Sequence, residues 1–141
     1  MRAHVSFKEL FNDWLEACLA ERVPENVRAL SFSINQRELC FRVELNGTSE
    51  FNRYGTAWTW SECWSPVTAK LRVPTIVCRG VLGNCSHAVT SELLRYLRGG
   101  ALRQKLSRYE GIAVESIDGE YELVWLNQGK SMKKNMRKRP I

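Results

Sequence analysis

The residues of this chain that could carry out chemistry are its five cysteines and two histidines. Cys78, Cys85 and His87 lie closest together, and thiolate and imidazole groups are typical zinc ligands. Six residues separate the two cysteines, whereas zinc sites usually begin with cysteines about two to four residues apart. The sequence also offers no evident fourth ligand. We therefore expect no metal site and no cofactor.

A cysteine nucleophile would need a histidine base within reach. His4 lies in the N-terminal arm, His87 precedes the apolar stripe of an expected helix, and neither belongs to a recognisable catalytic motif. A glycine-rich phosphate loop followed by lysine and a GxSxG motif are both missing from the sequence. We therefore expect a protein that is not an enzyme. A cysteine-dependent activity around Cys78, Cys85 and His87 is the alternative from the enzyme class.

Residues 53–64, here called the aromatic insert, are the better candidates for binding a partner. Aromatic and arginine side chains are enriched among the residues that dominate protein interfaces. Trp58-Thr59-Trp60 alternates and predicts a strand with both indoles on one face. A single strand tryptophan is more often buried than exposed, but three within seven residues cannot easily share one core, so we expect Trp64 to be exposed. The candidate partner-binding residues are Arg53, Tyr54, Trp58, Trp60, Glu62 and Trp64.

The net charge of +6 belongs to the end of the chain. Residues 128–141 carry six basic side chains and no acidic one, so residues 1–127 have 15 basic and 15 acidic residues. Such a tail could bind nucleic acid or an acidic membrane surface, although no aromatic residue is interleaved for base stacking. We expect it to be a disordered, solvated extension. The neutral body predicts that binding of a protein partner depends only weakly on salt.

The elements that must position these residues follow from local periodicity. Ser6 and Glu9 form a capping-box pattern, and the helix expected from Phe7 to Glu21 carries an apolar stripe. Two alternating segments, from Val27 to Ile34 and from Leu39 to Leu45, predict an antiparallel strand pair that ends at Asn46-Gly47-Thr48-Ser49. The apolar stripe consists of Phe7, Leu10, Phe11, Trp14, Leu15, Cys18 and Leu19.

The C-terminal half predicts helices followed by a hairpin. Helical spacing returns from about Ser86, stops at Gly99-Gly100, and continues in a short helix from Ala101 to Ser107. Asp118-Gly119 then predicts a two-residue turn between strands within residues 111–125. On the second strand Tyr121, Leu123 and Trp125 fall on one face. We expect residues 66–83 to be mostly irregular, with a short extended piece from Thr75 to Cys78.

One chain of this length fits one domain. Residues 1–127 are therefore expected to form a single α+β domain, with an antiparallel sheet and helices packed on one face. No apolar run approaches the ~20 residues of a membrane span, and the N-terminus lacks the apolar core of a secretory signal. We expect a cytoplasmic protein that does not bind membranes. The odd number of widely spaced cysteines does not indicate a disulfide framework.

Four segments taken together resemble a family of small bacterial cytoplasmic immunity proteins. These proteins are encoded beside polymorphic or contact-dependent growth-inhibition toxins. The similarity runs from about Ser6 to Trp125, matches the middle poorly, and is most specific at Glu44–Phe51 and Leu93–Trp125. The segments are FKELFNDWLEACL, VRALSFSIN, FRVELNGTSEFN and ELLRYLRGGALRQKLSRYEGIAVESIDGEYELVW.

The resemblance implies a protein that binds and neutralises one cognate toxin domain without catalysis. The chain departs from the family after Phe51, where relatives have an acidic run followed by a tryptophan. Here the sequence is NRYGTAWTWSECW, in which only Glu62 is acidic, so a basic nuclease would not meet the same run. The toxin could still be a nuclease, but the sequence does not specify its activity. The alternative function is a nucleic-acid-associated adaptor that uses the basic tail.

Overall fold

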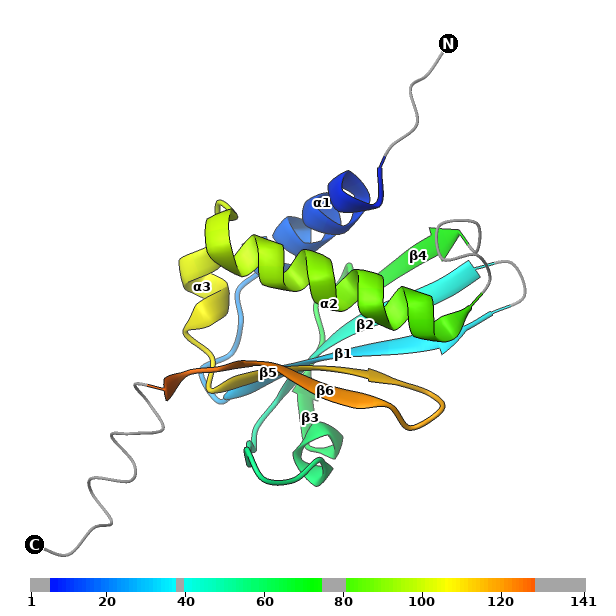
Figure 1. The fold of residues 1–141 in the computed structure, drawn as a ribbon. Helices are drawn as coiled ribbons and strands as arrows, with labels where there is room; N and C mark the ends of the chain where they lie inside the picture. The colour runs from blue at the N-terminus through cyan, green and yellow to red at the C-terminus, as the bar shows by residue number, and fades with distance from the viewer. Residues whose placement is uncertain (1–5, 38–39, 75–80, 129–141) are drawn as a thin grey trace, which may run out of the picture.

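The computed structural model describes residues 6–37, 40–74 and 81–128. Within these residues, helices cover one face of a six-stranded sheet (Figure 1). The expected α+β fold with helices on one face is confirmed. The helices are α1 (Phe7–Ala20), α2 (Leu82–Gly99) and α3 (Arg103–Ser107), with a 3₁₀-helix η1 (Ala57–Trp60). The strands are β1 (Ala29–Gln36), β2 (Cys40–Thr48), β3 (Glu62–Trp64), β4 (Lys70–Pro74), β5 (Gly111–Ser116) and β6 (Tyr121–Leu126).

Helix α1 begins and packs as its sequence predicts. The side-chain oxygen of Ser6 accepts a hydrogen bond from the backbone N–H of Glu9 at 3.1 Å, which satisfies one free donor of the first turn. At the other end, Lys105 Nζ donates to the carbonyl oxygen of Leu19, so α3 caps the C-terminus of α1. The apolar stripe turns five side chains into the core: Phe11, Trp14, Leu15, Cys18 and Leu19.

The sheet has the strand order β3-β2-β1-β5-β6, and β4 also pairs with β2. The antiparallel pairing of β1 with β2 is confirmed, but β1 and β5 run parallel, so the sheet is mixed. The parallel pair arises because α2 and α3 carry the chain back across the sheet before β5 begins. Just before β1 and β5 begin, the guanidinium group of Arg28 donates two hydrogen bonds, of 2.6 and 2.9 Å, to the carboxylate of Glu110.

The middle of the chain is more regular than its sequence predicts. Strand β2 does not end at Asn46 but continues through Gly47 and Thr48. A Cβ at Gly47 would lie 2.7 Å from a methyl group of Val27, so glycine is needed for close approach rather than to break the strand. The expectation of irregular structure over residues 66–83 was wrong at residues 70–74, which form β4, and at residues 82–83, which begin α2.

The extended piece expected from Thr75 to Cys78 lies outside the described residues, as does the basic tail from residue 129. Strand β4 itself is recognisable in hindsight by its alternation, since Leu71 and Val73 are buried while their neighbours are exposed.

The hairpin of β5 and β6 differs from its expected turn. The N–H of Gly119 donates to the carbonyl oxygen of Ser116 at 3.0 Å, and Gly119 has φ of 95°. The turn is therefore a three-residue loop with glycine at its left-handed position, and not a two-residue turn. A register shift between Ile112 and Ala113 then moves Trp125 to the helix-covered face. Trp125 and Leu123 therefore lie on opposite faces of the sheet, although strict alternation would have placed them on the same face.

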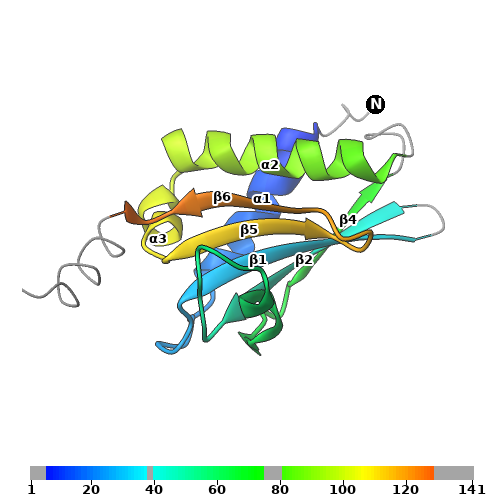
Figure 2. The ribbon, with the colours of Figure 1, turned by 60° about the horizontal axis from the view of Figure 1, so that its bottom comes forward.

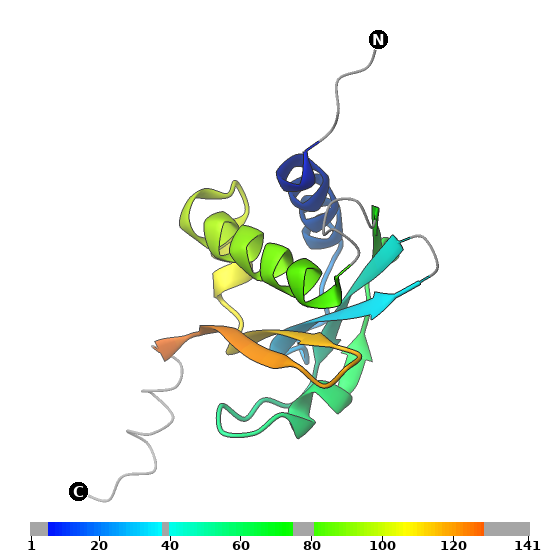
Figure 3. The same ribbon diagram turned by 45° about the vertical axis from the view of Figure 1, so that its right-hand side comes forward.

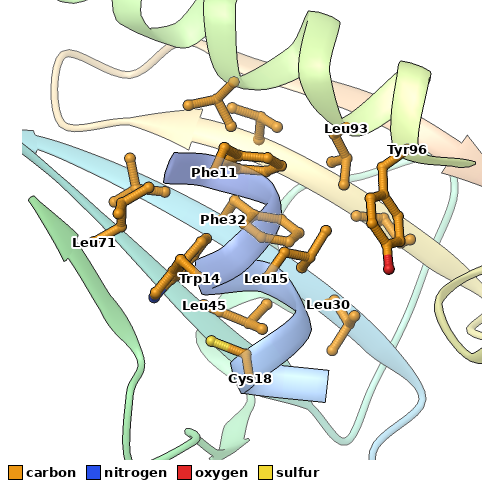
Figure 4. Packing of buried hydrophobic residues seen from close by; sticks show 14 of the residues in the cluster. Phe11, Trp14, Leu15, Cys18, Leu30, Phe32, Leu45, Leu71, Leu93 and Tyr96 are labelled. Atoms are coloured by element: carbon orange, nitrogen blue, oxygen red, sulfur yellow. The ribbon is translucent and has the colours of Figure 1, made fainter. Parts of the chain in front are cut away.

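The main core lies between the helices and the sheet. Figure 4 shows Phe11, Trp14 and Leu15 of α1 packed over Phe32 of β1. The ring centroids of Phe11 and Trp14 lie 6.2 and 6.0 Å from that of Phe32. Trp14 of the apolar stripe thus packs against the sheet, and its indole nitrogen donates to the carbonyl oxygen of Thr68 at 2.6 Å.

Candidate functional site

The face of the sheet opposite the helices, here called the open face, is the candidate functional site. Helices α1 and α2 lie together on one side of the sheet, and the segment that carries η1 lies on the other (Figures 2 and 3). A small second cluster anchors the aromatic insert there, consisting of Ala29, Trp58 and Ala113 with Phe51, Tyr121 and Leu123 packed against them. The insert is therefore held against the sheet by its own apolar contacts.

Trp58 is the anchor of this cluster. Its side chain is buried, and its ring packs edge-on against Phe51 and Tyr121 at centroid distances of 5.0 and 6.4 Å. The expected strand at Trp58-Thr59-Trp60 was wrong, because these residues form η1. A 3₁₀-helix has about three residues per turn, so side chains two positions apart cannot share a face as they do in a strand. Trp58 is consequently buried while Trp60 points into solvent.

The exposed tryptophan of the insert is Trp60, whereas the sequence had led us to expect Trp64. Trp60 is 87% exposed, whereas Trp64 is half-buried and packs against the main core. Trp64 pairs with Gly47 on β2, where the missing Cβ leaves room for the indole. Tyr54 is 86% exposed, and the guanidinium carbon of Arg53 lies 5.3 Å from its ring centroid. The insert thus presents two large aromatic side chains and an arginine to solvent.

A groove of about 610 Å³ lies beside the insert on the open face. Its floor is formed by β1 and β2, one wall by the insert and the other by the β5–β6 turn with the adjoining strand ends. The carboxylates that line it belong to Glu44, Glu62, Glu115 and Glu120. Among the described residues that line this groove, none is basic. The groove is therefore a strongly acidic surface, although residues 1–127 carry no net charge.

The carboxylate of Glu115 is held in place by neighbouring hydroxyl groups. Glu115 accepts hydrogen bonds from the hydroxyls of Ser31 and Ser33, at 3.3 and 3.4 Å. Beside the groove, the hydroxyl of Ser116 donates to Asp118 and lowers the pKa of that carboxyl. Asp118 therefore remains negatively charged at neutral pH.

Sequence reasoning identified Glu62 but missed the other three glutamates of the groove. They lie on β2, on β5 and in the β5–β6 turn, where each is one polar residue of an ordinary alternating segment. The alternation does place Glu44 and Glu115 on the polar face of their strands. Only the pairing order of the strands, with β1 between β2 and β5, brings these carboxylates to one groove.

The structure does not bring together the described cysteine and histidine side chains that could bind a metal ion or act in catalysis. Cys85 is fully buried in the core, while His87, two positions later on α2, is exposed. Cys78 and His4 lie outside the described residues. Within the described part of the chain, no three histidine, cysteine or acidic side chains are grouped in a way that could hold a metal ion.

None of the helices that the structure describes has the length and apolar character needed to cross a membrane. The acidic groove and the exposed aromatic side chains of the insert are the distinctive features of the described surface. Comparison with protein-family models, curated proteins and solved structures finds no match to this chain.

Proposed function

We propose that this protein is a non-enzymatic immunity protein of the bacterial cytoplasm, which binds one cognate toxin domain and blocks its active site or its access to substrate. The observation that carries the proposal is the aromatic insert: Trp58 anchors it, while Tyr54 and Trp60 stand 86% and 87% exposed. The sequence resemblance to immunity proteins points to the same class of function.

Exposed aromatic side chains on an anchored segment are suited to tight binding. Burying a large apolar side chain contributes about 1.5–3 kcal/mol. An anchored insert loses little conformational entropy when it docks, so more of this free energy remains for affinity. Tyr54 and Trp60, with Arg53 beside them, are of the residue types that dominate interface energetics. A toxin inhibitor must outcompete the toxin's substrate, so we expect nanomolar affinity, about −12 kcal/mol.

The test is co-expression of this chain with the toxin domain encoded beside it. The variants are Arg53→Ala, Tyr54→Ala and Trp60→Ala, and Trp64 is left unchanged because it is half-buried and supports the fold. Val67→Ala is the matched control, since Val67 is 94% exposed and does not line the groove. We expect the wild type and the control to protect cells and at least one insert variant to lose protection while remaining folded.

Two results would contradict the proposal at different levels. Full protection by all three folded insert variants would show that the insert is not the binding surface. A wild-type protein that neither binds the toxin domain nor protects cells would refute the immunity function. The nucleic-acid-associated adaptor, which uses the basic tail, would then become the leading account.

A further inference from the structure

We infer that the groove of the open face binds an arginine- or lysine-rich segment of a protein partner. The inference deepens the proposed function, because the toxin domain would supply that segment. The chemistry of the groove can nevertheless be tested without any toxin. Three features of the described residues carry the inference: the charge of the groove, its exposed apolar rim and the uncovered sheet face that forms its floor.

The lining of the groove carries negative charge on its floor and on both walls. Glu44 lies on the floor, Glu62 on the wall formed by the insert, and Glu115 and Glu120 on the opposite side. Like charges around a concave surface reinforce one another's potential and attract ions of opposite sign. None of the described lining residues is a lysine or arginine that could neutralise them. A cationic segment would relieve this repulsion, whereas a phosphate-bearing ligand would be repelled.

The rim of the groove adds an apolar surface that charge alone does not explain. Trp60 and Ile117, on opposite walls, are 87% and 72% exposed, and both line the groove together with Tyr121. A guanidinium group can stack on an aromatic ring while it donates two parallel hydrogen bonds to a carboxylate. Arginine also carries an apolar stem that can cover side chains such as Ile117. The combination of glutamates with an exposed indole therefore matches arginine better than a simple cation.

Basic residues of β4 lie at one end of the groove, beside Glu44. On β4, Lys70 lies directly opposite Glu44, and Arg72 lies opposite Arg42 two pairs further along. A cationic segment would be repelled from this end and would approach from the side of Glu62 and Glu120. The neutral body had led us to expect weak salt dependence of binding. Because charge is segregated on the open face, we expect instead that binding depends markedly on salt concentration.

The experiment measures the fluorescence anisotropy of a labelled oligo-arginine peptide on the full-length chain, with a glycine-serine peptide of equal length as the neutral probe. The test variant is Glu62→Gln with Glu120→Gln, because both side chains are exposed and lie on opposite walls. The matched control is Asp13→Asn with Glu25→Gln, which removes the same charge from two exposed positions outside the groove. Thermal melts establish that all variants fold.

We expect the groove variant to bind oligo-arginine about tenfold more weakly than the wild type, as befits the loss of two exposed ion pairs. The control should bind as the wild type does, and raising salt from about 50 to about 300 mM should weaken wild-type binding severalfold. Trp60→Ala should weaken oligo-arginine binding more than oligo-lysine binding. Equal loss in the groove and control variants, or equal binding of the neutral peptide, would overturn the inference.

The basic tail is a second possible occupant, since residues 129–141 carry six basic side chains. A chain truncated after Gln128 separates the two. If the full-length and truncated chains bind oligo-arginine alike, the groove is open to a partner. If only the truncated chain binds, the tail fills the groove and the inference of a partner segment fails. If the double groove variant loses oligo-arginine binding but still protects against the toxin, this inference fails while the immunity function stands.

Discussion

The indole nitrogen of Trp58 donates a hydrogen bond to the phenolic oxygen of Tyr121 at 3.2 Å, which joins the aromatic insert to β6 across 63 positions of sequence. This contact connects the two walls of the groove, since η1 belongs to one wall and Tyr121 to the other. Burial raises the pKa of Tyr121, so its hydroxyl stays protonated at neutral pH. The width of the groove therefore depends on a contact within the protein's own fold.

Removing that hydroxyl should loosen the insert without disrupting the main core. We expect Tyr121→Phe to lower the free energy of unfolding by about 1 kcal/mol, because the buried indole N–H of Trp58 is left unpaired. Limited proteolysis within residues 53–64 should become faster. Tyr54→Phe is the control, because it removes the same hydroxyl from a side chain that is 86% exposed. Indistinguishable stabilities and cleavage rates for the two variants would show that the contact does not hold the insert.

Replacing Trp14 or Trp60 by alanine should have very different effects on the free energy of unfolding. Trp14→Ala removes a buried ring and a hydrogen bond to Thr68, and we expect it to cost about 3–5 kcal/mol of stability. Trp60→Ala should change stability by less than about 0.5 kcal/mol, because that indole lies in solvent. Urea denaturation of the two variants measures both values. A cost below about 1 kcal/mol for Trp14→Ala would contradict its place in the core.

The buried thiol of Cys18 should make the fold less stable at alkaline pH. Burial raises its pKa from 9.0 to about 11, so the folded state keeps a proton that the unfolded state loses. The unfolded chain binds fewer protons between these values, and the free energy of unfolding therefore falls as pH rises from about 9 towards about 11. Urea midpoints measured across this range should fall less steeply for Cys18→Ala.

Tyr96 and Tyr121, whose pKa values burial also raises, contribute a slope of the same sign in both proteins. The comparison with Cys18→Ala therefore isolates the thiol. Parallel pH profiles for the wild type and the variant would exclude a contribution from Cys18.

Deleting residues 129–141 should leave the melting temperature almost unchanged. The segment is polar and strongly basic, so it can bury little apolar surface. Its removal takes away six basic residues and leaves 15 basic and 15 acidic residues. Scanning calorimetry of the full-length and truncated chains at two salt concentrations provides the measurement. A drop of several degrees would show that the tail packs on the body and that the domain boundary at residue 127 is misplaced.

Local sequence patterns determined the elements whose signals lie within a single segment. The capping box at Ser6 and the apolar stripe behind it specify α1, because helix initiation and amphipathicity are read over consecutive turns. Alternation over eight or nine residues likewise specifies β1 and β2, and therefore the antiparallel pair. The α+β fold class follows from the order of these elements.

Tertiary structure alone decided the environment of the aromatic insert. The same residue type is buried at Trp58, half-buried at Trp64 and exposed at Trp60. The difference depends on which distant segments lie against each indole: Phe51 and Tyr121 for Trp58, and Gly47 for Trp64. No periodicity within the insert encodes those neighbours.

The acidic groove has the same origin. Glu44 and Glu115 are 71 positions apart in the sequence, and β1 brings their strands together by pairing antiparallel with β2 and parallel with β5. Strand order results from how all the elements share one core, and local propensity does not contain it. The sequence by itself therefore determined α1, the β1–β2 pair and the fold class, whereas the packing of the core decided which carboxylates meet across the open face.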